Sequence, residues 1–321
     1  MTGIPLGPGP EFDRIRAIAA ALGQDARGLG NDCAVLPPGF GDVVISTDLS
    51  IEDVHFRREW LSLEEIGWRA AASALSDLAA CGAEVVGLTA SVGSPREAPA
   101  DHLVQLMRGV GAAVAACGGR VLGGDLAASP IWVVDVTVFG RAARPVGRAE
   151  ARAGDGVWVT GTLGGARAAL LEWEAGRTPA AGARERFAHP VPRIAEGRWL
   201  AAHGAHAMMD VSDGLGGDAG HLAAASGVRV EIALEQLPVH PDVVAVALAR
   251  GEPLQAFAAR GGEDYELLVV MPKTFEEGEA KRFQQDTGTV LTRIGRVRRG
   301  TGVAATFAGV NVALAGHDHF R

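Results

Sequence analysis

Aspartates recur in this sequence where short apolar runs give way to turns or to the starts of helices. Carboxylates at strand ends and helix starts converge on the edge of an α/β sheet where ligands usually bind. Asp77 differs, because it interrupts the apolar face of a helical stretch, where a carboxylate needs a partner. The aspartates at these positions are Asp32, Asp48, Asp77, Asp125, Asp210 and Asp213, with Ser46 and Thr47 directly before Asp48.

Such a set of oxygen donors, without His or Cys partners, favours a magnesium site. Mg²⁺ is held by a few carboxylates together with waters and substrate phosphates, and several ions neutralise charge while a phosphoryl group passes between oxygens. A strand-end aspartate is also a common turn former or N-cap, so position alone leaves both interpretations open for each residue.

Two familiar phosphate-binding designs are excluded. The sequence contains no GxxxxGK[ST] motif, which excludes a P-loop. Its two lysines, Lys273 and Lys281, lie too close to the C-terminal end to be the strand lysine of a protein kinase. Gly161–Gly165 (GTLGG) follows an apolar run but does not fit GxGxxG. We interpret it as a tight strand-to-helix turn, with a phosphate contact as the alternative.

Strand-like and helix-like segments alternate in both halves of the chain, which predicts an α/β (α+β) fold with mixed sheets. The arginine-rich, turn-rich segment 141–155 predicts a boundary between domains 1–145 and 146–321. The expected strands are Asp42–Asp48, Val85–Ser91, Ile131–Phe139, Val157–Thr160, Ala205–Asp210, Val228–Leu234, Glu266–Val270 and Val303–Phe307, and the expected helices are 11–23, one from Ser62 to about Gly82, 100–117, and Asp213 to about Ser226.

Composition narrows the class of protein. With 321 residues, 48% of them hydrophobic, the chain can bury two cores, and its net charge of −8 argues against a nucleic-acid partner. Three cysteines without a CxxC pair, and no export signal, predict reduced thiols and a cytoplasmic location. No apolar stretch is long enough to predict a membrane span.

Ten segments follow one another in order over nearly the whole chain: GNDCAVL (30–36), STDLSIEDVHF (46–56), ALSDLAACGA (74–83), GGD (123–125), VTGTLGGA (159–166), HPVPR (189–193), MDVSDGL (209–215), GGEDYELL (261–268), IGRV (294–297) and GHDHF (316–320). Together they resemble the thiamine-monophosphate kinase family, of the superfamily that includes aminoimidazole ribonucleotide synthetase. GGEDYELL and the terminal HF separate this branch from its synthetase relatives.

The resemblance implies a phosphotransferase with a phosphate group as acceptor: ATP gives its γ-phosphate directly to thiamine monophosphate, with Mg²⁺ and without a covalent enzyme intermediate. It also implies a homodimer paired through the N-terminal, ATP- and magnesium-binding domains, with the C-terminal domain completing the active site.

Carried over residue by residue, the resemblance assigns four groups. The residues of catalysis are Asp48, Asp213 and Arg148. ATP contacts are Gly124, Asp125, Arg148 and Ser212, and acceptor contacts are His55, Glu263 and His317. Magnesium ligands are Asp32, Ser46, Thr47, Asp48, Asp77, Asp125, Asp210 and Asp213.

The sequence departs from the family pattern at several positions. Asn31 replaces one of two acidic residues, Asp53 replaces a glycine, and Leu126 follows GGD where the family has threonine. His317 stands where the family has an aromatic ring that stacks on thiamine, and Cys117 where a ring is often found near the adenine.

Two further hypotheses therefore stay open: an ATP-dependent synthetase of the same superfamily, or a catalytically degenerate nucleotide-binding paralogue. A selenophosphate-synthetase hypothesis needs a reactive cysteine near the N-terminus, but the first one is Cys33. A hydrogenase-maturation hypothesis needs a C-terminal cysteine, and the sequence ends in His319-Phe320-Arg321.

Overall fold

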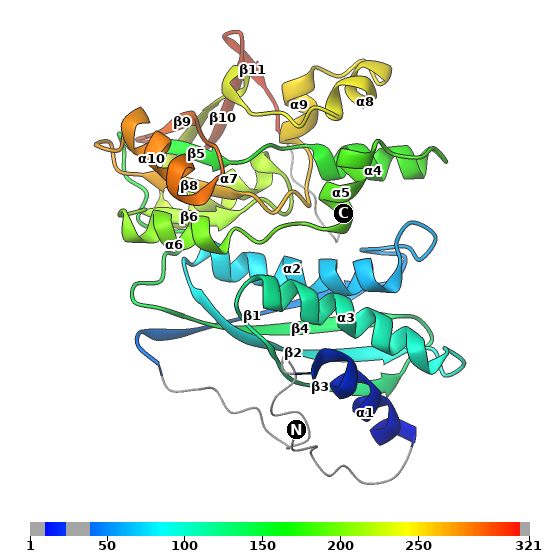
Figure 1. Ribbon diagram of the computed structural model, residues 1–321. Coiled ribbons are helices and arrows are strands. Elements are labelled where there is room, and N and C mark those ends of the chain that lie inside the picture. Colours follow the sequence, from blue (N-terminus) through cyan, green and yellow to red (C-terminus); the bar gives the residue numbers. More distant parts are fainter. Residues whose placement is uncertain (1–9, 24–38, 315–321) are drawn as a thin grey trace. The chain divides into compact units, whose positions relative to one another are not determined.

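A computed structural model describes residues 10–23 and 39–314, and the chain divides into two compact units (Figure 1). Unit 1 comprises Met1–Leu78 and Ala83–Ala143, and unit 2 comprises Ala79–Gly82 and Arg144–Arg321. The division lies close to the boundary predicted between 1–145 and 146–321. Within the described ranges, no helix is both long and apolar enough to cross a membrane.

Unit 1 is a four-stranded mixed sheet in the order β1-β4-β2-β3. β2 and β3 are parallel, whereas β4 runs antiparallel to both β1 and β2. The elements are α1 (Pro10–Leu22), β1 (Asp42–Ile51), α2 (Leu63–Ala80), β2 (Glu84–Ser94), α3 (Ala100–Ala116), β3 (Val121–Ala128) and β4 (Val133–Ala142).

The two faces of this sheet differ in burial. Val134, Val136 and Val138 of β4 are fully buried on the face that the helices cover. On the opposite face, Ile45 and Leu49 of β1 stay 59% and 42% exposed. Alternation along a strand thus places one apolar row in the core and leaves a second row exposed among the described residues.

Unit 2 is a seven-stranded mixed sheet in the order β11-β10-β7-β9-β5-β8-β6, flanked by helices. β7 and β10 are parallel and the other neighbouring pairs are antiparallel. The elements are β5 (Gly156–Thr160), α4 (Gly165–Glu174), α5 (Ala181–Ala188), α6 (Ile194–Ala202), β6 (Ala207–Asp210), α7 (Leu215–Ser226), β7 (Arg229–Ala233), η2 (Leu234–Gln236), α8 (Val243–Ala249), α9 (Leu254–Ala259), β8 (Leu267–Met271), α10 (Glu277–Thr287), β9 (Leu291–Arg298), β10 (Gly302–Phe307) and β11 (Val310–Val312).

The core of unit 2 explains its strand pattern. Both β6 and β8 are buried along their whole length, and Leu268 and Val270 of β8 pack in one core cluster with Leu215 and Leu222 of α7. The predicted α/β fold with mixed sheets is confirmed in both units.

Two of the predicted site residues lie inside strands rather than at their ends. β1 continues past Asp48 to Ile51, and Asp125 is in the middle of β3. The glycines before Asp125 permit a close strand approach, since a Cβ on Gly124 would lie 2.0 Å from the carbonyl oxygen of Ala90. Gly124 is therefore required by the sheet itself.

Candidate active site

In unit 2, two motifs that are far apart in sequence form one continuous structure. Beyond the β6–β8 pairing, the Val211 N–H donates to the Glu266 carbonyl at 2.8 Å, and the Tyr265 N–H donates to the Val211 carbonyl at 3.0 Å. The Glu263 N–H donates to the Ser212 carbonyl at 2.8 Å. The structure therefore brings together Ser212, predicted to contact ATP, and Glu263, predicted to contact the acceptor.

The backbone around Glu263 adopts an unusual conformation. Glu263 and Tyr265 have φ of 67° and 51°, in the left-handed region that is costly for residues other than glycine. The Tyr265 hydroxyl donates to the Glu263 carboxylate at 3.0 Å. A Cβ on Gly262 would lie 2.4 Å from the Ser212 carbonyl oxygen, so only glycine lets the two segments approach so closely.

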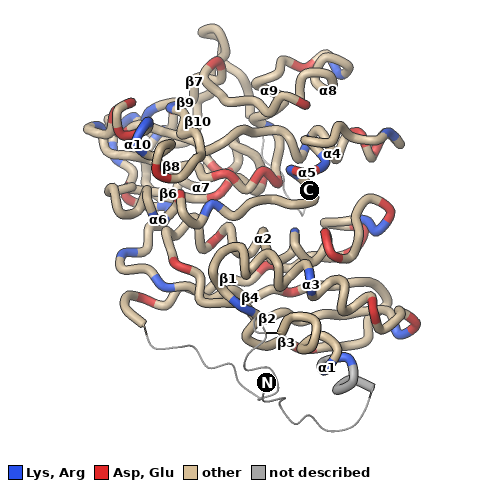
Figure 2. Tube along the Cα trace, viewed as in Figure 1, with Lys and Arg blue, Asp and Glu red and all other residues tan. Residues whose placement is uncertain are grey.

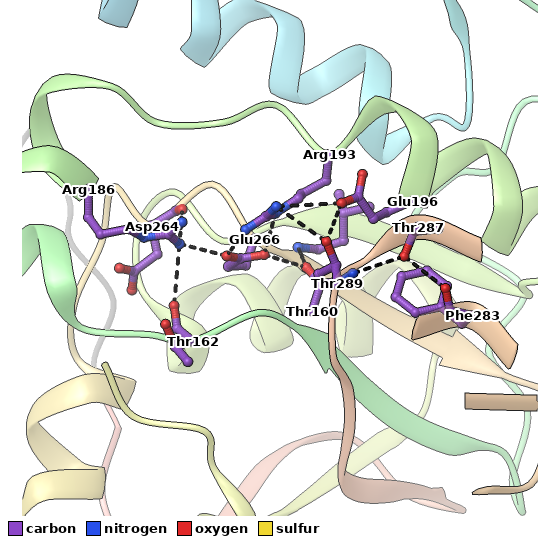
Figure 3. A network of polar contacts seen from close by, with 11 residues as sticks. Thr160, Thr162, Arg186, Arg193, Glu196, Asp264, Glu266, Phe283, Thr287 and Thr289 are labelled. Atoms are coloured by element: carbon purple, nitrogen blue, oxygen red, sulfur yellow. Dashed lines mark hydrogen bonds and ion pairs between the residues drawn. The ribbon is translucent and has the colours of Figure 1, made fainter. Parts of the chain in front are cut away.

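A buried ion network holds the end of this loop (Figure 3). The fully buried Glu266 carboxylate accepts hydrogen bonds from Arg186 at 2.6 Å, from Arg193 at 2.6 and 2.8 Å, and from the Thr160 hydroxyl at 2.7 Å. The arginines hold the pKa of Glu266 below its usual range against the opposing effect of burial. Thr160 in addition accepts a hydrogen bond from the N–H of Leu267 at 2.8 Å.

The next carboxylate in the motif, Asp264, occupies the N-terminus of α4. It accepts a hydrogen bond from the Gly164 N–H at 2.7 Å, while its second oxygen has no hydrogen-bond partner. Burial raises the pKa of Asp264 to about 7. The segment Gly161–Gly165 is a strand-to-helix turn as predicted, and its helix N-terminus binds a carboxylate of the protein, which argues against the alternative of a phosphate contact there.

Acidic residues gather where β6 passes into α7. Asp210 ends β6 and Asp213 precedes the helix, whose first turn contains the buried Asp218. Burial, followed by repulsion from Asp210 and Asp213, raises the pKa of Asp218 to about 8, although the Asp213 backbone N–H and the Arg148 guanidinium act in the opposite direction. Four charged groups of unit 2, three of them predicted site residues, thus interact electrostatically.

Arg148 is positioned by its backbone. The Ser226 hydroxyl donates to the Arg148 carbonyl at 3.0 Å, and the Met208 N–H donates to the adjacent Gly147 carbonyl at 2.9 Å. These bonds attach the residue-148 segment to the C-terminal end of α7 and to β6.

In unit 1, the predicted ligands divide between the two faces of the sheet. The Ser46 hydroxyl donates to the Asp77 carboxylate at 2.5 Å, which explains how a carboxylate is accommodated on α2. The Thr47 hydroxyl points to the other face and contacts Asp135 at 3.3 Å and Thr137 at 3.1 Å.

Asp48 and Asp125 lie in adjacent rows across the sheet but on its two edge strands. Asp48 is level with Val136, and Asp125 is level with Ser91 and Asp135. With β4 and β2 between them, three strand spacings of about 4.8 Å separate their backbones by roughly 14 Å. Within a single unit 1, these two carboxylates therefore lie on opposite edge strands of the sheet.

His55 follows β1 in a short turn. The Ile51 N–H donates to its Nδ1 at 3.1 Å, and the Asp53 N–H donates to the Phe56 carbonyl at 2.8 Å. Asp53 has φ of 65°, which accounts for the glycine expected at this position. Aspartate tolerates the left-handed region better than most residues do, so the turn survives the exchange.

Asp32 and His317 lie outside the described residues. Within 10–23 and 39–314, no three His, Cys, Asp or Glu side chains are close enough to form a ready-made metal cage. Sequence reasoning missed the buried Asp218, and it gave no role to Arg193, Asp264 or Glu266 although HPVPR and GGEDYELL contain them.

The comparisons with known proteins cover both units. The family model of the AIR synthase related protein N-terminal domain matches residues 30–142, and that of the C-terminal domain matches residues 152–307. Thiamine-monophosphate kinase of Mycobacterium tuberculosis is 37% identical over 75% of this chain and 74% of its own length. The corresponding kinase of Aquifex aeolicus is 32% identical over 97% of this chain and 98% of its own.

Comparison with solved structures points to the same family as the sequence matches do. Thiamine-monophosphate kinase from Stenotrophomonas maltophilia has a TM-score of 0.81 and 34% identity, covering 94% of this chain and 96% of its own. AaThiL complexed with AMPPCP and TMP has a TM-score of 0.78 and 31% identity, covering 100% of both chains. A hydrogenase maturation protein in complex with ATP, at 19% identity and a TM-score of 0.79, shares the fold alone. By these matches the chain belongs to the AIR synthase related proteins and, among them, to the thiamine-monophosphate kinase family.

Proposed function

We propose that this protein transfers the γ-phosphoryl group of ATP to thiamine monophosphate, giving thiamine diphosphate and ADP. The relatives that match nearly its whole length are named for this activity. The relative that binds both AMPPCP and TMP matches it from end to end.

The observation that carries the proposal is the hydrogen bond between Glu263 and Ser212. A residue assigned to the acceptor and a residue assigned to the nucleotide are joined backbone to backbone. Direct transfer needs the two substrates side by side, since an oxygen of the acceptor phosphate attacks the γ-phosphorus while the bond to the β-phosphate oxygen breaks. The attacking oxygen is already anionic, so the reaction needs no strong general base.

Arg148 is the residue we assign to phosphate binding in unit 2. A guanidinium can donate paired hydrogen bonds to phosphate oxygens. Its backbone is attached to β6 and α7, and its guanidinium interacts electrostatically with Asp218. Asp48 and Asp213 are the carboxylates we assign to catalysis together with it.

The donor set fits Mg²⁺. Carboxylate and hydroxyl oxygens are the ligands that this ion prefers, and it keeps waters and substrate phosphates in its shell, so a ready-made cage of three acidic side chains is not required. Asp218 is buried near Asp210 and Asp213, and its own oxygens accept no hydrogen bond of normal geometry. Such a carboxyl group fits a region that receives positive charge from a ligand. When bound, the ion neutralises charge on the phosphates. The residues we propose as ligands are Asp32, Ser46, Thr47, Asp48, Asp77, Asp125, Asp210 and Asp213.

The remaining contacts follow the family pattern. We propose that Gly124, Asp125 and Ser212 contact the nucleotide, and that His55, Glu263 and His317 contact the acceptor. The Nδ1 of His55 is bound to the Ile51 N–H, which fixes the orientation of its ring within the turn.

We also propose a homodimer formed through unit 1 and a cytoplasmic location. The uncovered apolar row of β1, with Val43, Ile45 and Leu49 each more than 40% exposed, supports pairing through this face of the sheet. ATP as phosphoryl donor supports the location. Acidic and basic residues are interspersed along the tube in both units (Figure 2), in keeping with small-molecule substrates and no nucleic acid.

The test is an assay of the purified chain with Mg-ATP and thiamine monophosphate, following thiamine diphosphate and ADP. We expect turnover that falls at least about 100-fold in Asp213→Asn and Asp48→Asn, because each loses a charge aimed at the transferring group. Asp101→Asn, an exposed carboxylate in the first turn of α3, is the matched control and should keep full activity.

The open alternatives give different results in the same assay. ATP binding without turnover on thiamine monophosphate would favour a degenerate nucleotide-binding paralogue. ADP formation that depends on another acceptor would favour a synthetase of the same superfamily.

A further inference from the structure

Asp218 is a carboxyl group buried inside unit 2. It lies in the first turn of α7, is 1% exposed, and neither of its oxygens accepts a hydrogen bond of normal geometry. Most buried polar side chains of a folded protein take part in such a hydrogen bond, so a carboxyl group this deeply buried without one needs a physical reason.

Its surroundings make the burial more costly. Asp210 and Asp213, one at the end of β6 and the other just before α7, act on it as like charges. The opposing contributions come from the Arg148 guanidinium and the Asp213 backbone N–H. Burying the charge of this carboxyl group near two further aspartates is costly, and a positive charge from a ligand offsets that cost.

A helix-capping role does not explain this residue. Acidic side chains in a first turn are stabilised by the helix dipole when they are exposed, as Asp101 is on α3. Asp218 is instead withdrawn from water, and the helix N-cap is Gly214, with φ of 100° and no side-chain cap.

We infer that Asp218 is a further residue of the cation–nucleotide site, supplying negative charge alongside Asp210 and Asp213 to a divalent cation that accompanies the nucleotide phosphates. This inference rests on the proposed function, because it takes a metal–nucleotide complex as the ligand. It adds a residue to which the family pattern gave no role.

The experiment is thermal unfolding of the full chain at fixed pH, in EDTA and then with increasing Mg²⁺, with and without ADP. Variants are Asp218→Asn, which keeps the shape and removes the charge, and Asp101→Asn as the exposed first-turn control. We expect Asp218→Asn to unfold at the same temperature as wild type or higher in EDTA, because the amide cannot carry the charge that burial and the neighbouring Asp210 and Asp213 disfavour. With Mg²⁺ and ADP, its rise in Tm should be smaller, and its apparent Mg²⁺ affinity about 10- to 100-fold weaker than wild type.

The opposite pattern would overturn the inference: a lower Tm in EDTA together with an unchanged response to Mg²⁺ and ADP marks a structural residue. If Asp218→Asn gives no folded protein, Asp218→Ser, which leaves room for a water, is measured in the same way. The readout is independent of turnover. A Mg²⁺ response that depends on Asp218 in a protein without kinase activity would sustain the inference and sink the proposed function, whereas normal activity with an unaltered response would do the reverse.

Discussion

The N–H of Glu263 donates a hydrogen bond to the carbonyl oxygen of Ser212 across 2.8 Å, although 50 residues separate them in the sequence. This bond continues the β6–β8 ladder beyond its last pair, Asp210 and Leu267. The loop that carries Glu263 is therefore an extension of the sheet, and its position depends on how closely the two chain segments can approach.

A substitution of Gly262 tests how closely the Ser212 and Glu263 segments must approach each other. In Gly262→Ala the new methyl group would lie 2.4 Å from the Ser212 carbonyl oxygen, so the two segments must separate. We expect a loss of about 1–3 kcal/mol in the free energy of unfolding, typical of an overpacked site. We also expect a KM for thiamine monophosphate raised several-fold. Urea denaturation and steady-state kinetics measure the two effects.

Gly220→Ala is the control for this change. Gly220 lies inside α7, and a Cβ there would meet no atom within 4 Å. The exchange should leave KM unchanged and stabilise the protein by up to about 1 kcal/mol, because alanine favours the helix. Equal effects of the two substitutions on KM would contradict the role of the Ser212–Glu263 contact.

The second prediction concerns the network around Glu266. In Glu266→Gln the partly buried guanidinium groups of Arg186 and Arg193, whose side chains are 17% and 15% exposed, lose their shared counter-charge. Breaking a buried pair of this kind costs about 3–5 kcal/mol. Denaturant unfolding of Glu266→Gln, Arg193→Gln and the double variant should give a coupling energy of about 1–3 kcal/mol, since the partners share one set of bonds.

Arg177→Gln provides the comparison. Its pair with Glu172 has the same bidentate geometry, but the arginine is 58% exposed. Solvent screens such a pair, so Arg177→Gln should lower the free energy of unfolding much less than Arg193→Gln does. A similar cost for both arginine variants would mean that burial does not strengthen the Glu266 network.

The third prediction is a pH dependence from Asp264. Its pKa in the folded protein is about 7 and its ordinary value is 3.8, so between these values the folded state holds a proton that the unfolded state has released. Stability from this group is therefore full below about pH 4 and is lost as the pH rises to about 7, with a slope of at most about 1.4 kcal/mol per pH unit.

Asp264→Asn removes this titration while its amide oxygen can still accept from the Gly164 N–H. The variant should gain stability relative to wild type as the pH rises from 4.5 to 7.5, measured by urea unfolding at each pH. The lowered pKa of Glu266 acts only below its ordinary range and is common to both proteins, so it cancels in the difference. Parallel stability curves would show that Asp264 does not keep its proton.

Sequence reasoning located the elements better than it located contacts between them. Periodicity and glycine punctuation predicted the strands that carry Ser46 and Asp210, because apolar runs bounded by turn residues are a local signal. It placed Asp48 at a strand end, yet β1 runs on through Leu49 and Ile51, whose outer face is uncovered. Nothing local marks where such a strand stops.

The sequence did not reveal which strands pair with one another or which distant side chains come into contact. Strand order puts Asp48 and Asp125 on opposite edges of their sheet, and no spacing along the chain encodes that. The charge of Glu266 was visible in GGEDYELL, but its partners Arg186 and Arg193 lie more than 70 residues away. Asp218 looked like an ordinary helix residue, because its burial depends on packing by unit 2 as a whole.

The last prediction concerns the uncovered face of unit 1. Ile45 is 59% exposed on β1, and pairing of two such sheets would bury it together with Leu49. We expect Ile45→Glu to shift the protein from dimer to monomer in sedimentation velocity at micromolar concentration, because a charge buried in an apolar interface is strongly unfavourable. Leu248→Glu is the matched control: this leucine on α8 is 69% exposed, and its replacement should leave the sedimentation coefficient unchanged. A wild-type chain that sediments as a monomer, or an Ile45→Glu variant that remains dimeric, would rule out this face as the dimer interface.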